Sequence, residues 1–306
     1  LSTGSTVISG TNDDGTLRRG TPRGYSMPSA SPFYPVDYIT TDLVTGLIWR
    51  TCSQGQSGMS CIGPASTMTW DDAIDSCTSL NQLNGGNGFA GITTWRLPTI
   101  EEIQSLQDYG KATNPIISNA AFPATVAGNY WSSTDSGTNA WTPSFDKGFT
   151  GRHPKTSTDY VRCVSGSGFE YGGNFTDHGD GTITDNTTGL IWQKCGRGQN
   201  NDSTCSGTTV KGAWTSALNY CNSLSLASYS WRLPNVNELK TIVDTTGTWP
   251  PIDPDMFPST DTSAAYWSST TVASMPANRW DTYSAGGAFT YDTNGWSNLT
   301  RCVTGP

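Results

Sequence analysis

Helical periodicity is confined to a few stretches of this chain, and much of the remainder alternates between polar residues and single aromatic or branched residues. After Thr69, the apolar residues Trp70, Ala73, Ile74 and Cys77 recur at intervals of three and four. This spacing places them on one face of a helix. Thr69 itself is a favourable N-cap residue. The pattern therefore predicts a short amphipathic helix that begins after Thr69.

Local signals predict a second helix and a set of strands. Thr99 with Glu102, and Asn235 with Glu238, have the spacing of a capping box at the start of a helix. Short aromatic stretches then lead to the segment 161–164, which favours short antiparallel strands. Each half of the chain is thus predicted to be an α+β unit, with two helices followed by a small antiparallel sheet.

The same motifs occur twice, in the same order, about 140 residues apart. The repeated pairs are 45–49 and 188–192, Trp70 and Trp214, 95–98 and 231–234, Phe122 and Phe257, 130–134 and 266–270, and 162–164 and 301–303. A period of that length indicates a duplicated domain, because solenoid repeats run to roughly 20–50 residues. We predict an extended amino-terminal arm over residues 1–36 and two tandem domains over residues 37–167 and 168–306.

Each copy contains four cysteines with similar spacing, which predicts disulfides, although four cysteines permit three pairings. The close pairs Cys52–Cys61 and Cys195–Cys205 suggest short hairpins, each closed by a disulfide. The remaining pairs, Cys77–Cys163 and Cys221–Cys302, would tie an early helix to the last strand. Zinc is disfavoured, because the chain has no Cys-x-x-Cys and only two histidines. Disulfides indicate an oxidising compartment, so we expect a secreted or cell-surface protein.

Composition narrows the classes of partner. Hydrophobic residues make up 34% of the chain and charged residues 14%, and the net charge is −8. An acidic surface repels phosphate groups, which disfavours nucleic acid and anionic membranes as partners. No apolar run approaches the roughly 18 residues of a membrane span. The chain begins at Leu1 rather than Met, which indicates a processed or trimmed form.

The repeated motifs resemble those of the bacterial DUF1566 domain, which includes the carboxy-terminal module of the Legionella collagen-like adhesin. The resemblance rests on Trp-x-x-Ala…Cys, Trp-Arg-Leu-Pro…Glu, Phe-Pro, Tyr-Trp-Ser-Ser-Thr and Arg-Cys-Val, and it covers both copies. It implies two C-type-lectin-like domains, a fold in which a disulfide joins the first helix to the last strand. That expectation agrees with the pairs Cys77–Cys163 and Cys221–Cys302.

The sequence departs from two properties of such lectin-like proteins. The Glu-Pro-Asn, Gln-Pro-Asp and Trp-Asn-Asp triplets of calcium-dependent lectins are absent from this chain. The Legionella module binds sulfated polysaccharides, whereas an acidic chain disfavours sulfated ligands. The segment from Asp177 to Asp185 is rich in oxygen-bearing side chains and resembles a calcium loop. Its Asp-Gly turn between Thr-rich strands favours a hairpin instead, so no cofactor is expected.

No constellation of catalytic residues is repeated in the two copies. The histidines, His153 and His178, occupy non-equivalent places and lack a repeated acid partner. Glu102 and Glu238 are accounted for by helix capping. Gly86 to Gly91 matches a dinucleotide fingerprint, but no strand precedes it, so we interpret it as a loop. We therefore expect a non-enzymatic protein.

Polar and aromatic residues before the last strand of each copy are candidate ligand contacts, because rigid rings lose little entropy on binding. Trp141 and Trp280 occupy equivalent positions, which also allows a role in the core. The candidates are Asn139, Trp141, Asp146, Lys147 and Arg152 in the first copy, and Asn278, Arg279, Trp280, Asp281, Tyr283, Tyr291, Asp292, Asn294 and Trp296 in the second.

The arm is rich in Ser, Thr, Gly and Pro and contains Arg18, Arg19 and Arg23 in an otherwise acidic protein. We expect it to lie either over its own domains or on a neighbouring copy, for example by strand addition. Two functions follow. The first is an adhesin-like protein that binds a glycan or protein ligand. The second is a subunit of an extracellular filament or sheath that polymerises through its arm.

Overall fold

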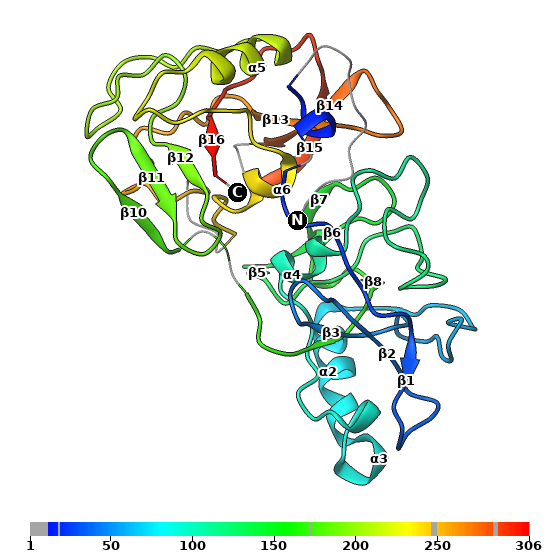
Figure 1. The fold of residues 1–306 in the computed structure, drawn as a ribbon. Coiled ribbons are helices and arrows are strands. Elements are labelled where there is room, and N and C mark those ends of the chain that lie inside the picture. Colours follow the sequence, from blue (N-terminus) through cyan, green and yellow to red (C-terminus); the bar gives the residue numbers. More distant parts are fainter. Residues whose placement is uncertain are drawn as a thin grey trace. The chain divides into compact units, whose positions relative to one another are not determined.

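The chain folds into two compact units, which are coloured along the sequence in Figure 1. The first-copy unit consists of Thr21–Asp108 and Thr113–Glu170, and the second-copy unit consists of Leu1–Gly20, Tyr109–Ala112 and Tyr171–Pro306. The computed structural model describes residues 12–17, 19–169, 171, 173–245, 250–283 and 287–305. Arg18 lies outside these residues, as does the side chain of Tyr283.

The first-copy unit contains short antiparallel strands in three groups. The first group is ordered β1-β2-β3-β9, the second is the ribbon β5-β6-β7, and the third pairs β4 with β8. The strands are β1 (Ser29–Ala30), β2 (Tyr38–Thr41), β3 (Ile48–Arg50), β4 (Thr67–Met68), β5 (Asp135–Ser136), β6 (Asn139–Pro143), β7 (Thr150–Pro154), β8 (Asp159–Tyr160) and β9 (Val164–Ser165).

Helices begin where the sequence predicts them. The helix α2 (Trp70–Ser79) starts after the N-cap Thr69, and α4 (Ile100–Ser105) starts at the Thr99 capping box. In that box the Thr99 hydroxyl accepts the Glu102 amide, and Glu102 Oε2 accepts the Thr99 amide at 2.8 Å. Between α2 and α4 lie three single turns: η1 (Leu80–Gln82), α3 (Leu83–Gly86) and η2 (Phe89–Gly91).

The second-copy unit repeats this plan with longer strands. One sheet is ordered β10-β11-β12-β16, and β13, β14 and β15 form an antiparallel ribbon. The elements are α1 (Asp14–Leu17), β10 (Phe175–Asp177), β11 (Thr182–Asp185), β12 (Ile191–Gln193), α5 (Trp214–Ser223), α6 (Val236–Lys240), β13 (Tyr266–Thr271), β14 (Asn278–Tyr283), β15 (Ala288–Thr293) and β16 (Val303–Thr304). The fold is therefore α+β in both units.

The segment predicted as one extended arm is divided between the two units. Residues up to Gly20 belong to the second-copy unit, and residues from Thr21 onward belong to the first-copy unit. Within the latter, β1 pairs with β2 much as β10 pairs with β11 in the second copy. The carboxy-terminal part of the arm therefore does have a counterpart in the repeat, which the sequence comparison missed because no motif marks it.

Two pairs of repeated tryptophans make matched hydrogen bonds inside the fold. Trp70 and Trp214 each donate their indole N–H to the carbonyl of a motif serine, Ser132 and Ser268, at 2.8 Å. Trp131 does the same toward Met68, and its counterpart Trp267 toward Gly212. Because a buried indole N–H needs an acceptor, these pairs explain why both copies retain tryptophan there.

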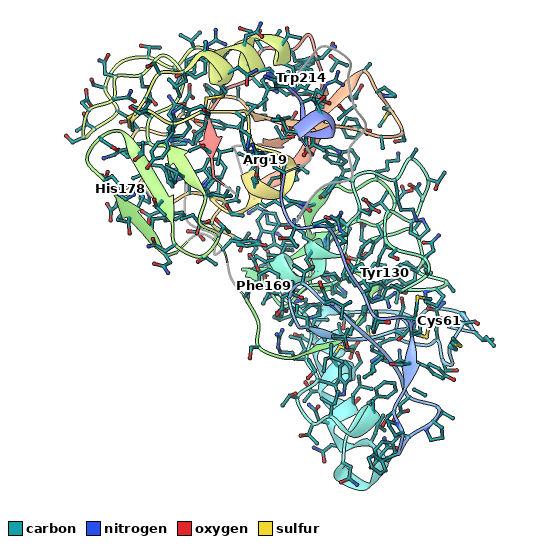
Figure 2. All side chains as sticks on the ribbon, viewed as in Figure 1. Arg19, Cys61, Tyr130, Phe169, His178 and Trp214 are labelled. Carbon is teal, nitrogen blue, oxygen red and sulfur yellow. A yellow bond between two sulfur atoms is a disulfide. The ribbon has the colours of Figure 1, made fainter. Side chains whose placement is uncertain are left out.

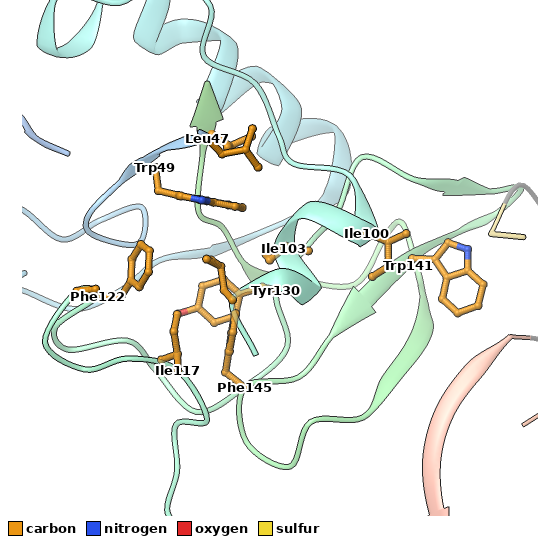
Figure 3. Close-up of a cluster of buried hydrophobic side chains, with 12 residues drawn as sticks. Leu47, Trp49, Ile100, Ile103, Ile117, Phe122, Tyr130, Trp141 and Phe145 are labelled. Atoms are coloured by element: carbon orange, nitrogen blue, oxygen red, sulfur yellow. The ribbon is translucent and has the colours of Figure 1, made fainter. Parts of the chain in front are cut away.

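One core cluster of the first-copy unit is shown in Figure 3, where Trp49, Phe122, Tyr130 and Phe145 are drawn with Ile100 and Ile103 of α4. The buried Arg162 stacks over the Phe122 ring at 4.9 Å and donates to the carbonyls of Arg50 and Thr51. Arg301 occupies the same role in the second copy, beside Phe257. The repeated arginines are thus backbone-binding groups inside the fold.

Four disulfides join the pairs that the spacing suggests: Cys52–Cys61, Cys77–Cys163, Cys195–Cys205 and Cys221–Cys302. The two long-range bridges connect α2 and α5 to the residues just before β9 and β16. Within the described part of the chain, no helix has the length and apolar content needed to cross a membrane.

The two capping boxes give a prediction for each unit. Thr99→Ala and Asn235→Ala remove the side chain that accepts the amide of Glu102 or Glu238. Each variant is expected to lower the free energy of unfolding by about 1 kcal/mol. Urea unfolding followed by tryptophan fluorescence measures this loss. Thr99→Ser and Asn235→Ser retain a neutral side-chain acceptor at the cap and serve as controls, and an equal loss in them would contradict the capping role.

Candidate functional site

An open groove of about 630 Å³ lies on the first-copy unit beside the repeated Trp-Arg-Leu-Pro motif. One wall is the exposed end of α2, and the other is formed by the start of α4 and the segment that follows β9. Figure 2 labels Phe169 on that segment. The lining residues are Ile74, Thr78, Arg96, Leu97, Thr99, Ser133, Gly168 and Phe169.

Arg96, one of the lining residues of this groove, forms an ion pair with Glu102. Arg96 holds Glu102 through two hydrogen bonds of 2.6 Å, and the hydrogen bond to Glu102 raises the pKa of Arg96. Gly168 passes directly over the pair, because a Cβ there would lie 2.8 Å from Glu102 Oε1 and 3.1 Å from an Arg96 nitrogen. The charge of Arg96 is therefore balanced by Glu102, and the rest of the lining includes hydroxyl groups and one aromatic ring.

The corresponding surface of the second copy is covered. Arg232 and Glu238 form the same double hydrogen bond, yet each is only 8% exposed, whereas the Arg96 side chain is 34% exposed. Ser269 and Thr270 are buried, while their counterparts Ser133 and Thr134 are partly exposed. The two copies therefore share the framework of this site but differ in its accessibility.

The predicted ligand contacts of the first copy are only partly accessible. Trp141 is 2% exposed and belongs to the core, so the core interpretation holds for it. Arg152 is exposed and stacks over the Trp141 ring at 5.2 Å. Lys147 is exposed, and Asn139 and Asp146 are half-buried. Lys147 and Arg152 are thus the members of this set that a ligand reaches most easily.

Three central candidates of the second copy are buried, which corrects their assignment as surface contacts. Arg279, Trp280 and Asp281 are 4%, 2% and 0% exposed. The strand β14 that contains them has β13 on one side and β15 on the other, and both of its faces are covered. Of the remaining candidates, Asn294 and Trp296 are exposed, and Asn278, Tyr291 and Asp292 are half-buried.

Asp281 is a carboxyl group buried in this ribbon. Burial, together with the nearby Asp292 carboxylate, raises the pKa of Asp281 from 3.8 to about 8. Asp292 in turn accepts a hydrogen bond of 2.9 Å from Asn298. A neutral Asp281 is therefore the favoured form within the folded protein near neutral pH.

In the first copy, a histidine and an aspartate occupy the positions of Asp292 and Asn298. His153 Nδ1 lies 2.8 Å from Asp159 Oδ2, a pairing that the sequence did not predict. The other ring nitrogen faces the Asn129 amide at 3.5 Å. Burial raises the pKa of Asp159, and His153 partly offsets this. The pair links β7 to β8, which accounts for it as a structural contact.

The Asp177–Asp185 segment forms the predicted hairpin between β10 and β11. Asp177 accepts the Gly179 amide and pairs with Lys194 at 2.7 Å, and Asp180 accepts the Thr182 amide. These carboxylates are engaged in turn and ion-pair contacts. Among the residues that the structure describes, no cluster of three or more His, Cys, Asp or Glu side chains has the geometry of a metal site.

The described arm residues make two different sets of contacts. Arg23 donates to the carbonyls of Ser105 and Gln107 and lies 3.6 Å from Asp108, so it anchors the chain to its own first-copy unit. Arg19, labelled in Figure 2, is exposed. Arg18 lies outside the described residues, so its predicted role in assembly stays a prediction.

Two acidic arm residues that the sequence analysis passed over are buried in the second-copy unit. Asp13 is 0% exposed and Asp14 is 4% exposed. Asp14 Oδ2 accepts a 2.9 Å hydrogen bond from Thr270 on β13. The sequence did contain a signal for this contact. Two adjacent aspartates interrupt an otherwise uncharged Ser- and Gly-rich segment, and a flexible linker does not need such a pair.

Comparison with known families assigns the repeat. The family described as the Lcl C-terminal domain matches residues 38–165 and 181–304, which together exceed half of the chain. No curated protein matches the chain.

Proposed function

The chain belongs to the Lcl C-terminal domain family through two tandem copies, and from this premise we propose that it is a non-enzymatic, adhesin-like binding protein of the extracellular space. The proposal places the ligand, a glycan or a segment of another protein, in the groove of the first-copy unit. The observation that supports it best is that this groove is open while its counterpart in the second copy is covered.

Four disulfides in a chain of this family are consistent with an extracellular protein. The order of two helices and short antiparallel strands, with a bridge from the first helix of each copy to its last strand, fits the proposed C-type-lectin-like fold. In such a fold, the helix-to-strand bridge holds the groove walls together. A rigid groove loses little entropy when it binds a ligand.

The lining of the groove favours a neutral polar ligand. Thr78 and Ser133 direct their hydroxyl protons to the carbonyls of Ile74 and Pro98, which leaves the oxygen lone pairs to accept from ligand hydroxyls. Phe169 provides an aromatic surface for the apolar face of a sugar or side chain. Arg96 is neutralised by Glu102, and the net charge of −8 opposes sulfated ligands.

A blocking substitution tests the groove. Thr78 is exposed near the end of α2, so Thr78→Trp fills the groove without disturbing the core. Binding to a panel of neutral and sulfated polysaccharides, measured by biolayer interferometry, is expected to weaken at least roughly tenfold, the equivalent of about 1.4 kcal/mol. The strongest binding is expected among the neutral members.

The duplication offers a matched control. Asn222 is the counterpart of Thr78 and is exposed on α5, where the neighbouring motif surface is covered. Asn222→Trp should leave binding unchanged. Binding that survives Thr78→Trp but is lost in Trp296→Ala would move the ligand site to the exposed end of the β15 region. Failure of every panel member to bind would contradict the glycan form of the proposal.

A second candidate function is self-assembly into an extracellular filament or sheath. The observation that favours it is the burial of Asp13 and Asp14, because an arm that inserts two carboxylates into a folded unit is a specific docking element. Light scattering on the full chain and on a version that begins at Thr21 tests this function. The truncation retains Arg23 and β1, which belong to the first-copy unit. Large assemblies that disappear on truncation would support it.

A further inference from the structure

The arm segment 12–17 is held by a buried contact site in the second-copy unit, and the first copy has no arm at the equivalent place. The helix α1 packs on β13, and its N-terminal turn is closed by Asp13, whose carbonyl accepts the amides of Thr16 and Leu17. The Asp13 carboxylate also accepts the Thr16 hydroxyl at 2.6 Å. The segment is therefore a preformed turn that presents Asp14 to β13.

The contact site consists of two buried polar residues, Thr270 and Arg279. Thr270 accepts the Val236 amide at 2.9 Å and donates its proton to Asp14 Oδ2 at 2.9 Å. Arg279 stacks over the Trp214 ring at 4.2 Å, with its charge close enough to Asp13 for attraction to offset part of the cost of burying it. A buried guanidinium requires such a partner.

The first copy shows what this site is like without an arm. Thr134 accepts the Ile100 amide just as Thr270 accepts Val236, but it remains partly exposed. The cation over Trp70 is Lys155, at 4.0 Å, and its acid partner is the neighbouring Asp135, at 2.7 Å. There the acid lies 20 residues from the lysine in the sequence. In the second copy the acid that faces Arg279 is Asp13, more than 250 residues away in the sequence.

We call the segment 12–17, with its buried Asp13 and Asp14, the plug. A short exposed connector joins it to the rest of the chain. Residues 19–22 are all exposed, and the chain enters the first-copy unit at Thr21. Arg23 then anchors it to the end of α4. A buried plug at one end of an exposed connector is the arrangement that permits exchange of identical elements between copies, because the contacts of the plug are the same in either chain.

We propose that the Asp13–Asp14 plug of one copy seats against Thr270 and Arg279 of a second copy, which links the copies through exchanged arms. The inference rests on the self-assembly function proposed above and identifies the contact that joins two copies. Such a contact is heterologous, so successive exchanges in one direction produce an open chain, while mutual exchange produces a closed dimer. The acidic net charge makes random contacts between copies unfavourable, and the Arg279 seat offers a specific positive partner.

Two variants, each with one cysteine added to the eight that form the native disulfides, test the exchange. A chain with Asp14→Cys and a chain with Thr270→Cys each lack a partner for this pair within themselves. After the two are mixed at high concentration and oxidised, a covalent dimer is expected on a non-reducing gel. The intramolecular positive control is the double variant Asp14→Cys/Thr270→Cys, which should form the bridge in the monomer.

The first copy provides the matched negative control. Thr134→Cys places a thiol at the position equivalent to Thr270, and its mixture with Asp14→Cys is expected to lose the dimer band. If the double variant forms its bridge but the mixture gives no dimer above this control, each arm stays with its own chain and the proposal is overturned. Absence of the bridge in the double variant would show that Asp14 does not lie against Thr270, which also overturns the proposal. Assemblies seen by light scattering without this dimer would leave self-assembly standing through another surface.

Discussion

The variant Asp281→Asn is expected to be more stable than the wild-type protein above pH 8, by on the order of 5 kcal/mol. The reason is the burial of this carboxyl group in β14, beside Asp292, which raises its pKa from 3.8 to about 8. Ionised Asp281 is disfavoured in the folded protein but not in the unfolded chain. An asparagine has no charge at any pH, so it removes this cost.

The sign of the pH dependence follows from the raised pKa. Below about pH 4, Asp281 is protonated in both states, and its contribution to stability is fully present. As the pH rises from 4 toward 8, the unfolded chain releases the proton while the folded protein retains it, so the stability of the wild type falls. Above about pH 8 both states are ionised and the loss is complete.

Chemical denaturation of the second-copy unit between pH 4 and pH 9 measures this difference. The wild-type and Asp281→Asn curves should nearly coincide at pH 4 and separate steadily up to pH 8. Asp255→Asn, an exposed substitution in the same unit, controls for the loss of one carboxyl group. A constant gap between Asp281→Asn and the wild type at all pH values would contradict the role of ionisation.

Removal of the Cys77–Cys163 bridge is expected to lower the stability of the first-copy unit by about 4.6 kcal/mol, against about 2.6 kcal/mol for Cys52–Cys61. These values follow from the loss of chain entropy in loops of 86 and 9 residues. Cys77 and Cys163 also lie within the core cluster that contains Trp95 and Trp131. Replacement by alanine therefore adds a packing loss to the entropic term.

Paired alanine variants of each bridge, compared by guanidinium unfolding, test this ranking. The second copy repeats the experiment with Cys221–Cys302, a loop of 81 residues, and Cys195–Cys205, a loop of 10 residues. The order of losses should be the same in both units. If removal of the short bridges costs as much as removal of the long ones, loop closure is not the dominant effect.

Local and duplicated features of this protein were predictable from its sequence. The helix starts at Thr69, Thr99 and Asn235 depend on side chains within three residues of the amides they cap. The hairpin at Asp177–Asp185 depends on an Asp-Gly turn. The spacing shared by the two copies suggested the disulfide partners, although it left three pairings open, and the family resemblance agreed with the long-range pairs.

Burial in the ribbon of the second copy was not predictable in the same way. The stretch from Asn278 to Tyr283 contains polar and charged residues, so it resembles a surface strand. In the structure β14 lies between two strands and is covered on both faces. Alternation along a strand indicates two faces but does not tell which of them another part of the chain covers.

The sequence by itself determined two tandem Lcl domains and their helix caps, and it suggested their four bridges, because each of these depends on neighbouring residues or on comparison of one copy with the other. Only the tertiary structure decided that Trp141, Trp280 and Asp281 are inside, that the motif groove is open in one copy, and that Asp14 reaches Thr270. The physical reason is that burial and charge pairing are set by segments far apart in the chain. For Asp14 and Thr270 that separation is 256 residues, and no local pattern records it.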